Sequence, residues 1–184
     1  MKPLKGYNNA QASTGYERLE AGGYVIKITG VHDEKADDKQ YLRICYDIAE
    51  GPEAGRYKEI DPKDNNANWR CSFIRSYKET ALGMFKAFIM AIDETNGTKF
   101  GEVIESGFDE QKLVGRYLGV VFGYEEYEAN DGNVKERLYV KSCMSADRIR
   151  TGDYKVPALK KMKAVAKNDP IPGFTALTDS DIPF

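Results

Sequence analysis

Aromatic side chains stand beside Lys or Arg at many points of the chain, a pairing that suits binding of a single-stranded nucleic acid. The sequence contains 12 Tyr, 8 Phe and 1 Trp. A base that stacks on a ring face gains about 1–3 kcal/mol, and the neighbouring cation neutralises the phosphate. The positions predicted to make such contacts with DNA are Tyr41, Arg43, Arg56, Tyr57, Lys58, Trp69, Arg70, Arg75, Tyr77, Lys78, Arg137, Tyr139 and Lys141. At each single position core packing is the alternative, because aromatic residues also favour β-strands.

A second chemical signal is an apolar segment at the end of an acidic stretch. It consists of Asp179, Asp181, Ile182, Pro183 and Phe184. A partner protein could hold the Phe ring in a pocket, pair Arg or Lys with the free carboxylate, and place basic side chains near the aspartates. We therefore predict a partner-binding tip, with an inert hydrophobic terminus as the alternative.

Catalytic and metal-binding patterns are scarce in the sequence. Three Cys and one His offer few ligands for a structural zinc site, and no Walker or G-x-S-x-G motif occurs. Carboxylates gather at Glu125, Glu126, Glu128 and Asp131, around a predicted turn, where runs of charge usually mark an exposed loop. We therefore expect no cofactor, no metal and no enzymatic activity. A metal-dependent nuclease that uses these carboxylates is the alternative.

Hydrophobic periodicity predicts the strands that would position these residues. Apolar and polar residues alternate over residues 24–29 and 41–49, as in strands with one buried face. Residues 69–75, 115–127 and 134–144 are also predicted to be strands. The polar residues 32–39 are expected to form a loop, and residues 130–133 to form a hairpin turn.

A helix is predicted between the third and fourth strands. Leu82, Phe85, Ile89 and Ile92 recur at helical spacing. Ser76 and Glu79 have the spacing of a capping box, and Asn96 with Gly97 supplies a stop. Three strands, one helix and two strands follow one another as in the OB-fold. The predicted fold is therefore mainly β, an OB-like five-stranded Greek-key barrel with one helix between strands three and four.

Composition divides the chain into four parts. We predict a mobile N-terminal arm (1–18), an OB-like single-stranded DNA-binding domain (19–150), a basic segment (151–167) with a short helix over 156–165, and a flexible acidic tail (168–184). The net charge of −2 hides an asymmetry, because the tail contains three Asp and no Lys or Arg. No apolar run would span a bilayer and no signal peptide is recognisable, so we expect a cytoplasmic protein with reduced thiols.

The end of the chain, Asp-Ser-Asp-Ile-Pro-Phe, closely resembles the acidic tip of bacterial single-stranded DNA-binding proteins. In that family the tip docks onto recombination mediators, exonucleases, helicases and primase. A weaker resemblance, over roughly residues 19–145, is to small phage proteins linked to replication and single-strand binding. It rests on Leu19, Ala21, Gly22 and Tyr24, on Tyr41, Leu42 and Arg43, and on Glu50, Gly51, Gly55 and Arg56.

These resemblances imply a protein that coats and protects single-stranded DNA in phage replication or recombination, with little sequence preference. They also imply recruitment of replication, recombination or repair proteins through the tip, in the cytoplasm of a bacterial host. A recombination accessory or strand-annealing protein is the alternative, and a homo-oligomer is compatible with either. The body of the chain does not match the bacterial proteins closely enough to carry over their binding residues.

Overall fold

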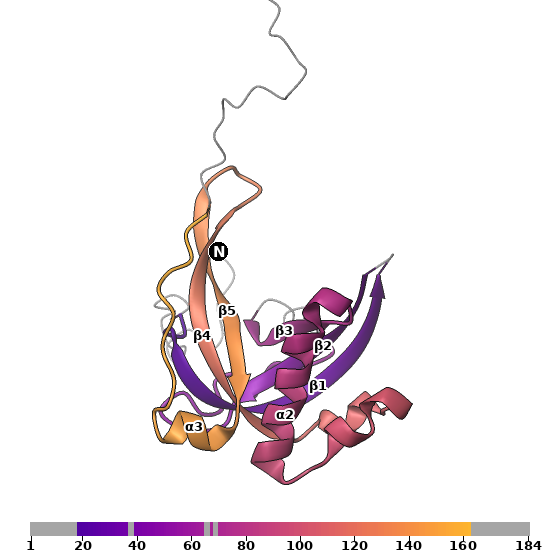
Figure 1. The fold of residues 1–184 in the computed structure, drawn as a ribbon. Coiled ribbons are helices and arrows are strands. Elements are labelled where there is room, and N and C mark those ends of the chain that lie inside the picture. The colour runs from indigo at the N-terminus through magenta and orange to yellow at the C-terminus, as the bar shows by residue number, and fades with distance from the viewer. Residues whose placement is uncertain (1–17, 37–38, 65–66, 68–69, 163–184) are drawn as a thin grey trace, which may run out of the picture.

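The computed structural model describes residues 18–162, apart from 37–38, 65–66 and 68–69, as a mainly β fold with one long helix (Figure 1). Its elements are β1 (Gly22–Ala36), β2 (Lys39–Ile48), β3 (Ser72–Ser76), η2 (Glu79–Ala81), α2 (Leu82–Asn96), η3 (Phe100–Glu102), η4 (Ile104–Ser106), η5 (Glu110–Leu113), β4 (Tyr117–Glu128), β5 (Val134–Met144) and α3 (Ala146–Arg150). The predicted order of three strands, one long helix and two strands is confirmed. The predicted tail, and all of the predicted arm except residue 18, lie outside the described residues.

All of these strands belong to one antiparallel sheet, in the order β3-β2-β1-β4-β5. The long central strand β1 is curved (Figure 1), and it pairs with β4 through its first half and with β2 through its second. β3 and β5 remain the two edges of the sheet. The sheet is therefore not closed into a barrel, and the predicted five-stranded barrel is corrected to an open five-stranded sheet.

The core lies between the sheet and α2. Ile26, Ile28 and Ile44 of the sheet are fully buried, as are Phe88 and Ile92 of the helix. Burial of an aliphatic or phenyl side chain of this size contributes about 1.5–3 kcal/mol. This apolar layer holds α2 against the sheet.

The two ends of α2 compare differently with the sequence prediction. The predicted capping box is absent: the hydroxyl of Ser76 accepts from the backbone N–H of Lys78 at 3.2 Å, and a 3-10 turn precedes the helix, which begins at Leu82. The predicted stop is confirmed, because the helix ends at Asn96 and Gly97 follows with φ 64°, a left-handed conformation that glycine adopts without strain.

Arg75 of β3 fills the gap between the two edge strands. Its guanidinium donates from Nη2 to Cys143 Sγ of β5 at 3.0 Å and from Nη1 to the carbonyl of Ile74 at 2.9 Å. It also lies 4.7 Å from the ring centre of Phe73 and 5.9 Å from that of Phe88 on α2. A side-chain contact and the helix thus connect β3 and β5, instead of a strand ladder.

Of the polar residues 32–39, predicted to form a loop, those that the structure describes instead belong to strands β1 and β2. β1 continues to Ala36 and β2 begins at Lys39. Contacts with β2 and with the loop after it stabilise this polar end of the β1–β2 hairpin. Glu34 pairs with Arg43 of β2, and the His32 ring is hydrogen-bonded to the carbonyl of Pro62 in the loop. The stretch shows no apolar alternation because both of its faces carry polar groups.

The segment after α3, which we call the strap (residues 151–162), is not helical where a helix over 156–165 was predicted. It runs along β4 (Figure 1), where Lys160 N donates to the carbonyl of Tyr124 and Lys160 O accepts from Glu126 N, both at 3.0 Å. Pro157 lies against β4 so closely that a Cβ at Gly123 would come within 2.4 Å of its ring. The strap is therefore packed onto the sheet.

The remaining helices are short. η3, η4 and η5 occupy the segment between α2 and β4, where the sequence pattern is mixed, and α3 has 5 residues. No helix among the described residues is long and apolar enough to cross a membrane.

Candidate nucleic-acid interface

The predicted DNA contacts occupy buried, half-buried and exposed positions. Buried are Tyr57 and Arg75; half-buried are Tyr41, Arg43, Arg56, Tyr77 and Tyr139; exposed are Lys58, Arg70, Lys78, Arg137 and Lys141. Outside the described residues are Trp69 and the tip residues Asp179, Asp181, Ile182, Pro183 and Phe184.

Two of the predicted contacts are core residues. Tyr57 is 5% exposed and packs edge-on against Tyr46, with ring centres 5.8 Å apart. Its backbone N–H donates to Asp47 Oδ1 at 2.8 Å, which holds this part of the chain against β2. Arg75 is 9% exposed in the gap between β3 and β5. Neither side chain presents a free face to a base in this structure, where both pack in the interior, so their role as DNA contacts stays a prediction that their burial disfavours.

Two predicted arginines are already paired with carboxylates. Arg43 Nη2 lies 2.6 Å from Glu34 Oε1, and the Arg43 side chain is 16% exposed. Arg56 pairs with Glu53 and is 14% exposed. A phosphate would have to displace a carboxylate from a largely buried guanidinium at either position, so these arginines are poor phosphate contacts.

Tyr77 faces α2. Its ring centre lies 5.7 Å from that of Phe85, and its hydroxyl donates to Asp33 Oδ1 at 3.2 Å. Burial, with the negative charge of Asp33 nearby, raises the pKa of Tyr77 to about 12. The ring therefore connects the β1–β2 arm to α2.

Other predicted contacts come together on the outward face of the β4–β5 hairpin. The register pairs Glu125 with Arg137 and Tyr127 with Lys135, and the alternation along a strand places Tyr139 on the same face. We call this surface the hairpin face. It consists of Glu125, Tyr127, Lys135, Arg137 and Tyr139 of the hairpin, together with Lys160 of the strap.

Each tyrosine of the hairpin face lies beneath a cation. The Arg137 guanidinium is 5.2 Å from the ring centre of Tyr127, and Lys160 Nζ is 5.7 Å from that of Tyr139. A cation within about 6 Å of a ring centre is attracted to the ring face. The Arg137 and Lys160 side chains are 61% and 66% exposed, so both charges can meet a phosphate from solvent.

Glu125 lies between these two cations. Its Oε1 accepts from Arg137 Nη2 at 2.8 Å and from Nε at 2.9 Å, and its Oε2 accepts from Lys160 Nζ at 2.8 Å. The Glu125 side chain is 14% exposed. The hydrogen bond from Lys160, with those from Arg137, holds the pKa of Glu125 below its usual value although partial burial acts in the opposite direction.

Two further lysines add positive charge to this region. The register steps from Ser142 to Val140 opposite Val121 and Phe122, which leaves Lys141 as the extra residue of a bulge. Lys141 is exposed and forms no ion pair with a residue that the structure describes. Lys135 Nζ lies 2.8 Å from Asp131 Oδ2 in the hairpin turn.

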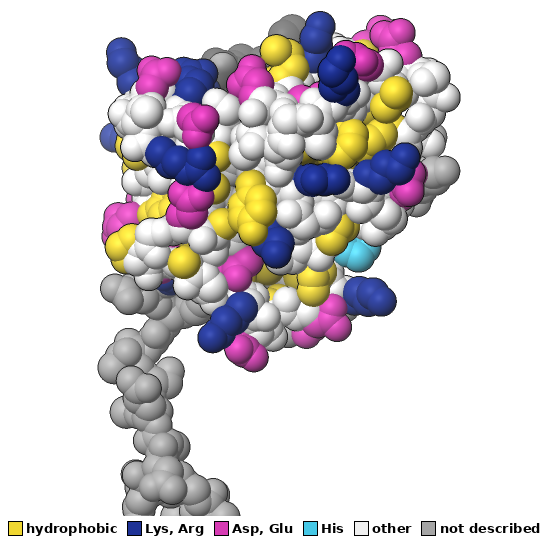
Figure 2. All heavy atoms as spheres, turned by 90° about the horizontal axis from the view of Figure 1, so that it is seen from below, with side chains coloured by type: hydrophobic (Ala, Val, Ile, Leu, Met, Phe, Trp, Pro, Cys, Tyr) yellow, Lys and Arg dark blue, Asp and Glu magenta, His cyan; other side chains and the backbone are white. Residues whose placement is uncertain are grey.

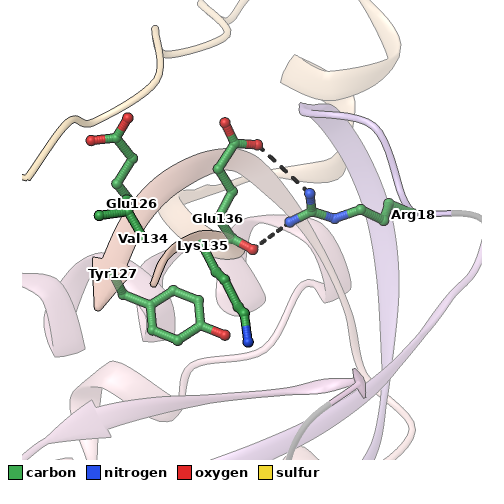
Figure 3. A pocket seen from close by; sticks show the side chains of 6 residues that line it. All are labelled: Arg18, Glu126, Tyr127, Val134, Lys135 and Glu136. Atoms are coloured by element: carbon green, nitrogen blue, oxygen red, sulfur yellow. Dashed lines mark hydrogen bonds and ion pairs between the residues drawn. The ribbon is translucent and has the colours of Figure 1, made fainter. Parts of the chain in front are cut away.

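An open pocket of about 470 Å³ lies beside the end of the hairpin (Figure 3). Glu126, Tyr127, Lys135 and Glu136 line it, and Arg18 reaches in from the N-terminal side toward the carboxylate and the carbonyl of Glu136. Figure 3 shows the Tyr127 ring and the Lys135 side chain extending side by side, away from the carboxylate of Glu126.

Sequence reasoning missed the parts of the site that come from distant segments. Lys160 lies in the segment predicted to be basic and to contain a short helix, and it was not predicted as a contact, yet it donates a hydrogen bond to Glu125. Tyr127 was predicted within a strand but not as a contact; its position opposite Lys135, two residues after Glu125 and so on the same strand face, was the available signal. By contrast Arg137 and Tyr139 do share the predicted face, with Leu138 and Val140 packed against the core on the other side.

The carboxylates around the hairpin turn form ion pairs and hydrogen bonds. Asp131 pairs with Lys135, and Glu126 accepts from the backbone N–H of Met162 at 3.0 Å. Among the described residues no group of three or more His, Cys, Asp or Glu side chains is placed to hold a metal ion.

Charge is mixed on the face seen in Figure 2, the underside of the view in Figure 1. Basic and acidic side chains alternate there, with hydrophobic side chains between them. That face shows no continuous basic surface. Cation–ring pairs also occur outside the hairpin face: Lys27 Nζ lies 5.7 Å from the ring centre of Tyr117, and the Arg116 guanidinium lies 5.6 Å from that of Phe100.

Comparison with known proteins adds nothing to the two resemblances described in the sequence analysis, which rest only on the residues given there. The chain matches no model of a known protein family, and no curated protein sequence matches it significantly.

Proposed function

We propose that this protein binds single-stranded DNA through the hairpin face, stacking bases on Tyr127 and Tyr139. The observation that carries the proposal is the placement of an exposed cation beside each ring, Arg137 beside Tyr127 and Lys160 beside Tyr139. Ring faces accept any base and cations accept any phosphate, so such a surface binds with little sequence preference.

Positive charges gather on the same surface. Four cations (Lys135, Arg137, Lys141 and Lys160) lie on or next to the hairpin face, where Asp131 and Glu125 pair with three of them, while Glu126 and Glu136 line the adjoining pocket. Local clustering matters more for a polyanion than the charge of the whole chain, which is −2.

We further propose that the fold is an OB-like fold opened between its third and fifth strands. The order β3-β2-β1-β4-β5 and the position of α2 between β3 and β4 support this. OB-folds are partly open barrels in which the hairpin between strands four and five carries ligand contacts. The hairpin face occupies the corresponding place.

The tail completes the proposal. We propose that Asp179, Asp181, Ile182, Pro183 and Phe184 recruit replication, recombination or repair proteins, as the resemblance to the bacterial tip implies. Coating of single strands in phage DNA replication or recombination is then the biological role. Annealing of complementary oligonucleotides by the purified protein would place it among recombination accessory proteins instead.

The experiment compares two double variants that change the charge equally. Arg137→Gln with Lys141→Gln alters the proposed site, and Lys99→Gln with Lys112→Gln alters exposed positions near η3 and η5. Binding to a labelled dT oligomer of about 30 nucleotides is measured by fluorescence anisotropy at several salt concentrations.

We expect the first variant to bind about tenfold more weakly at low salt, with a log–log salt slope smaller by about 1.4 because two phosphate contacts are lost. The second variant should stay within about twofold of the wild type, since its charges lie away from the strand. Equal losses in both variants, or no affinity of the wild type at low salt, would contradict the proposal.

A further inference from the structure

The carboxylate of Glu125 is held between two cations that come from different parts of the chain. Arg137 belongs to β5, while Lys160 belongs to the strap, 35 residues away from Glu125. Arg137 Nη2 lies 2.8 Å from Glu125 Oε1, and Lys160 Nζ lies 2.8 Å from Glu125 Oε2. A single anionic group thus bridges the two cations that the proposed function assigns to phosphates.

A carboxylate and a phosphodiester make the same type of contact with these cations. Both present two anionic oxygens, and guanidinium groups bind either one through paired N–H groups. Arg137 donates from Nη2 and Nε to the same oxygen of Glu125, so its remaining N–H groups point elsewhere. Lys160 binds as a point charge and can follow a ligand by rotating its side chain.

We infer that Glu125 occupies, in the free protein, the place that a DNA phosphate takes between Arg137 and Lys160. The inference rests on the proposed function, and it adds a phosphate-binding pair and an internal competitor to that site. A phosphate that arrives must draw both cations away from Glu125. The carboxylate therefore weakens binding and keeps the two cations close to the tyrosine rings until a strand is present.

A purely structural role for Glu125 would lead to a different result when Glu125 is replaced. The backbone of Lys160 already bonds to Tyr124 and Glu126, and Pro157 packs on Gly123, so the strap has attachments that do not involve the Lys160 side chain. If Glu125 served only to position Arg137 and Lys160, its removal would loosen the cations and weaken DNA binding.

The test uses Glu125→Gln in the full chain, with Glu136→Gln as the matched control. Both remove one negative charge from the same hairpin and one ion pair with an arginine, but the carboxylate of Glu136 pairs with Arg18 and forms no ion pair with Arg137 or Lys160. Affinity for a dT oligomer of about 30 nucleotides is measured between about 50 and 200 mM salt.

We expect Glu125→Gln to bind about two- to tenfold more tightly than the wild type, because the two ion pairs of Glu125 no longer have to be broken. Its log–log salt slope should be steeper by about 0.7, since one more positive charge becomes free to neutralise a phosphate. Glu136→Gln should change affinity by less than about twofold. Unchanged or weaker binding by Glu125→Gln would overturn the inference while leaving the proposed function in place.

A second pair of variants keeps the inference testable if Glu125→Gln folds poorly. Lys160→Gln should weaken binding, and Lys161→Gln, at the next exposed position of the strap, should have a smaller effect. Equal effects of the two lysines would also overturn the inference. Absence of binding by the wild type and by every variant would instead overturn the proposed function itself.

Discussion

Arg75 is the residue whose replacement most sharply separates a packing role from a DNA-binding role. It is 9% exposed, its Nε has no hydrogen-bond partner in the described part of the chain, and no carboxylate there pairs with it. Its plane lies near the rings of Phe73 and Phe88, at 4.7 and 5.9 Å from their centres. The structure thus uses a charged side chain to fill apolar space between β3 and β5.

The expected stability changes follow from this environment. Arg75→Ala removes most of the side chain from a packed site, and large-to-small core replacements cost about 2–5 kcal/mol. We expect a value near the lower end, about 2–3 kcal/mol. The buried Nε without a partner costs the wild type about 1–3 kcal/mol, and the variant is relieved of that cost because it lacks the atom. Arg75→Met keeps the length and much of the volume, so its stability should lie within about 1 kcal/mol of the wild type.

Urea unfolding followed by circular dichroism measures both changes. With a slope of about 2 kcal/mol per molar urea, Arg75→Ala should lower the midpoint by about 1–1.5 M and Arg75→Met by less than about 0.5 M. Lys86→Ala, at an exposed position of α2, is the control and should change stability by less than about 0.5 kcal/mol. Arg75→Met should also bind DNA like the wild type. A loss in Arg75→Met as large as that in Arg75→Ala, or a selective loss of DNA affinity in a stable Arg75→Met, would refute this account of the residue.

Two further predictions concern Tyr77 and the tip. Because the folded pKa of Tyr77 is about 12 against about 10 for a free tyrosine, its contribution to stability should be complete below pH 10 and disappear as pH rises from about 10 to 12. Tyr77→Phe should remove this part of the alkaline stability loss; an unchanged pH profile in the variant would show that another group causes it. Phe184→Ala should abolish capture of partner proteins and leave both the unfolding midpoint and DNA affinity within error of the wild type, and retained capture of every partner would show that the tip is inert.

Elements with a local apolar period were predictable from the sequence. α2 has a buried face whose helical repeat is visible in any short window, and β4 is an apolar run followed by a turn and β5, so both were predicted close to their observed bounds. The polar second half of β1 has no such repeat, because ion pairs and hydrogen bonds with β2 and the loop after it stabilise that arm.

The candidate site was only partly predictable, because residues next to each other in sequence have different environments. Tyr57 stands between Arg56 and Lys58 like a nucleic-acid contact, yet it is a core residue held by Asp47. Neighbouring charges say nothing of whether a ring is buried. The contact between Glu125 and Lys160 depends on where the strap packs, and no pattern within either segment contains that information.

Chemical-shift mapping by NMR tests the central claim most directly. A titration of the isotopically labelled protein with a short dT oligomer should shift the amide and side-chain signals of the hairpin face, above all those of Tyr127, Arg137, Tyr139 and Lys160. Signals of the buried Tyr57 and Arg75 should move little. Shifts concentrated on other elements with the hairpin face unchanged, or no shifts at low salt, would contradict the claim that this surface binds single-stranded DNA.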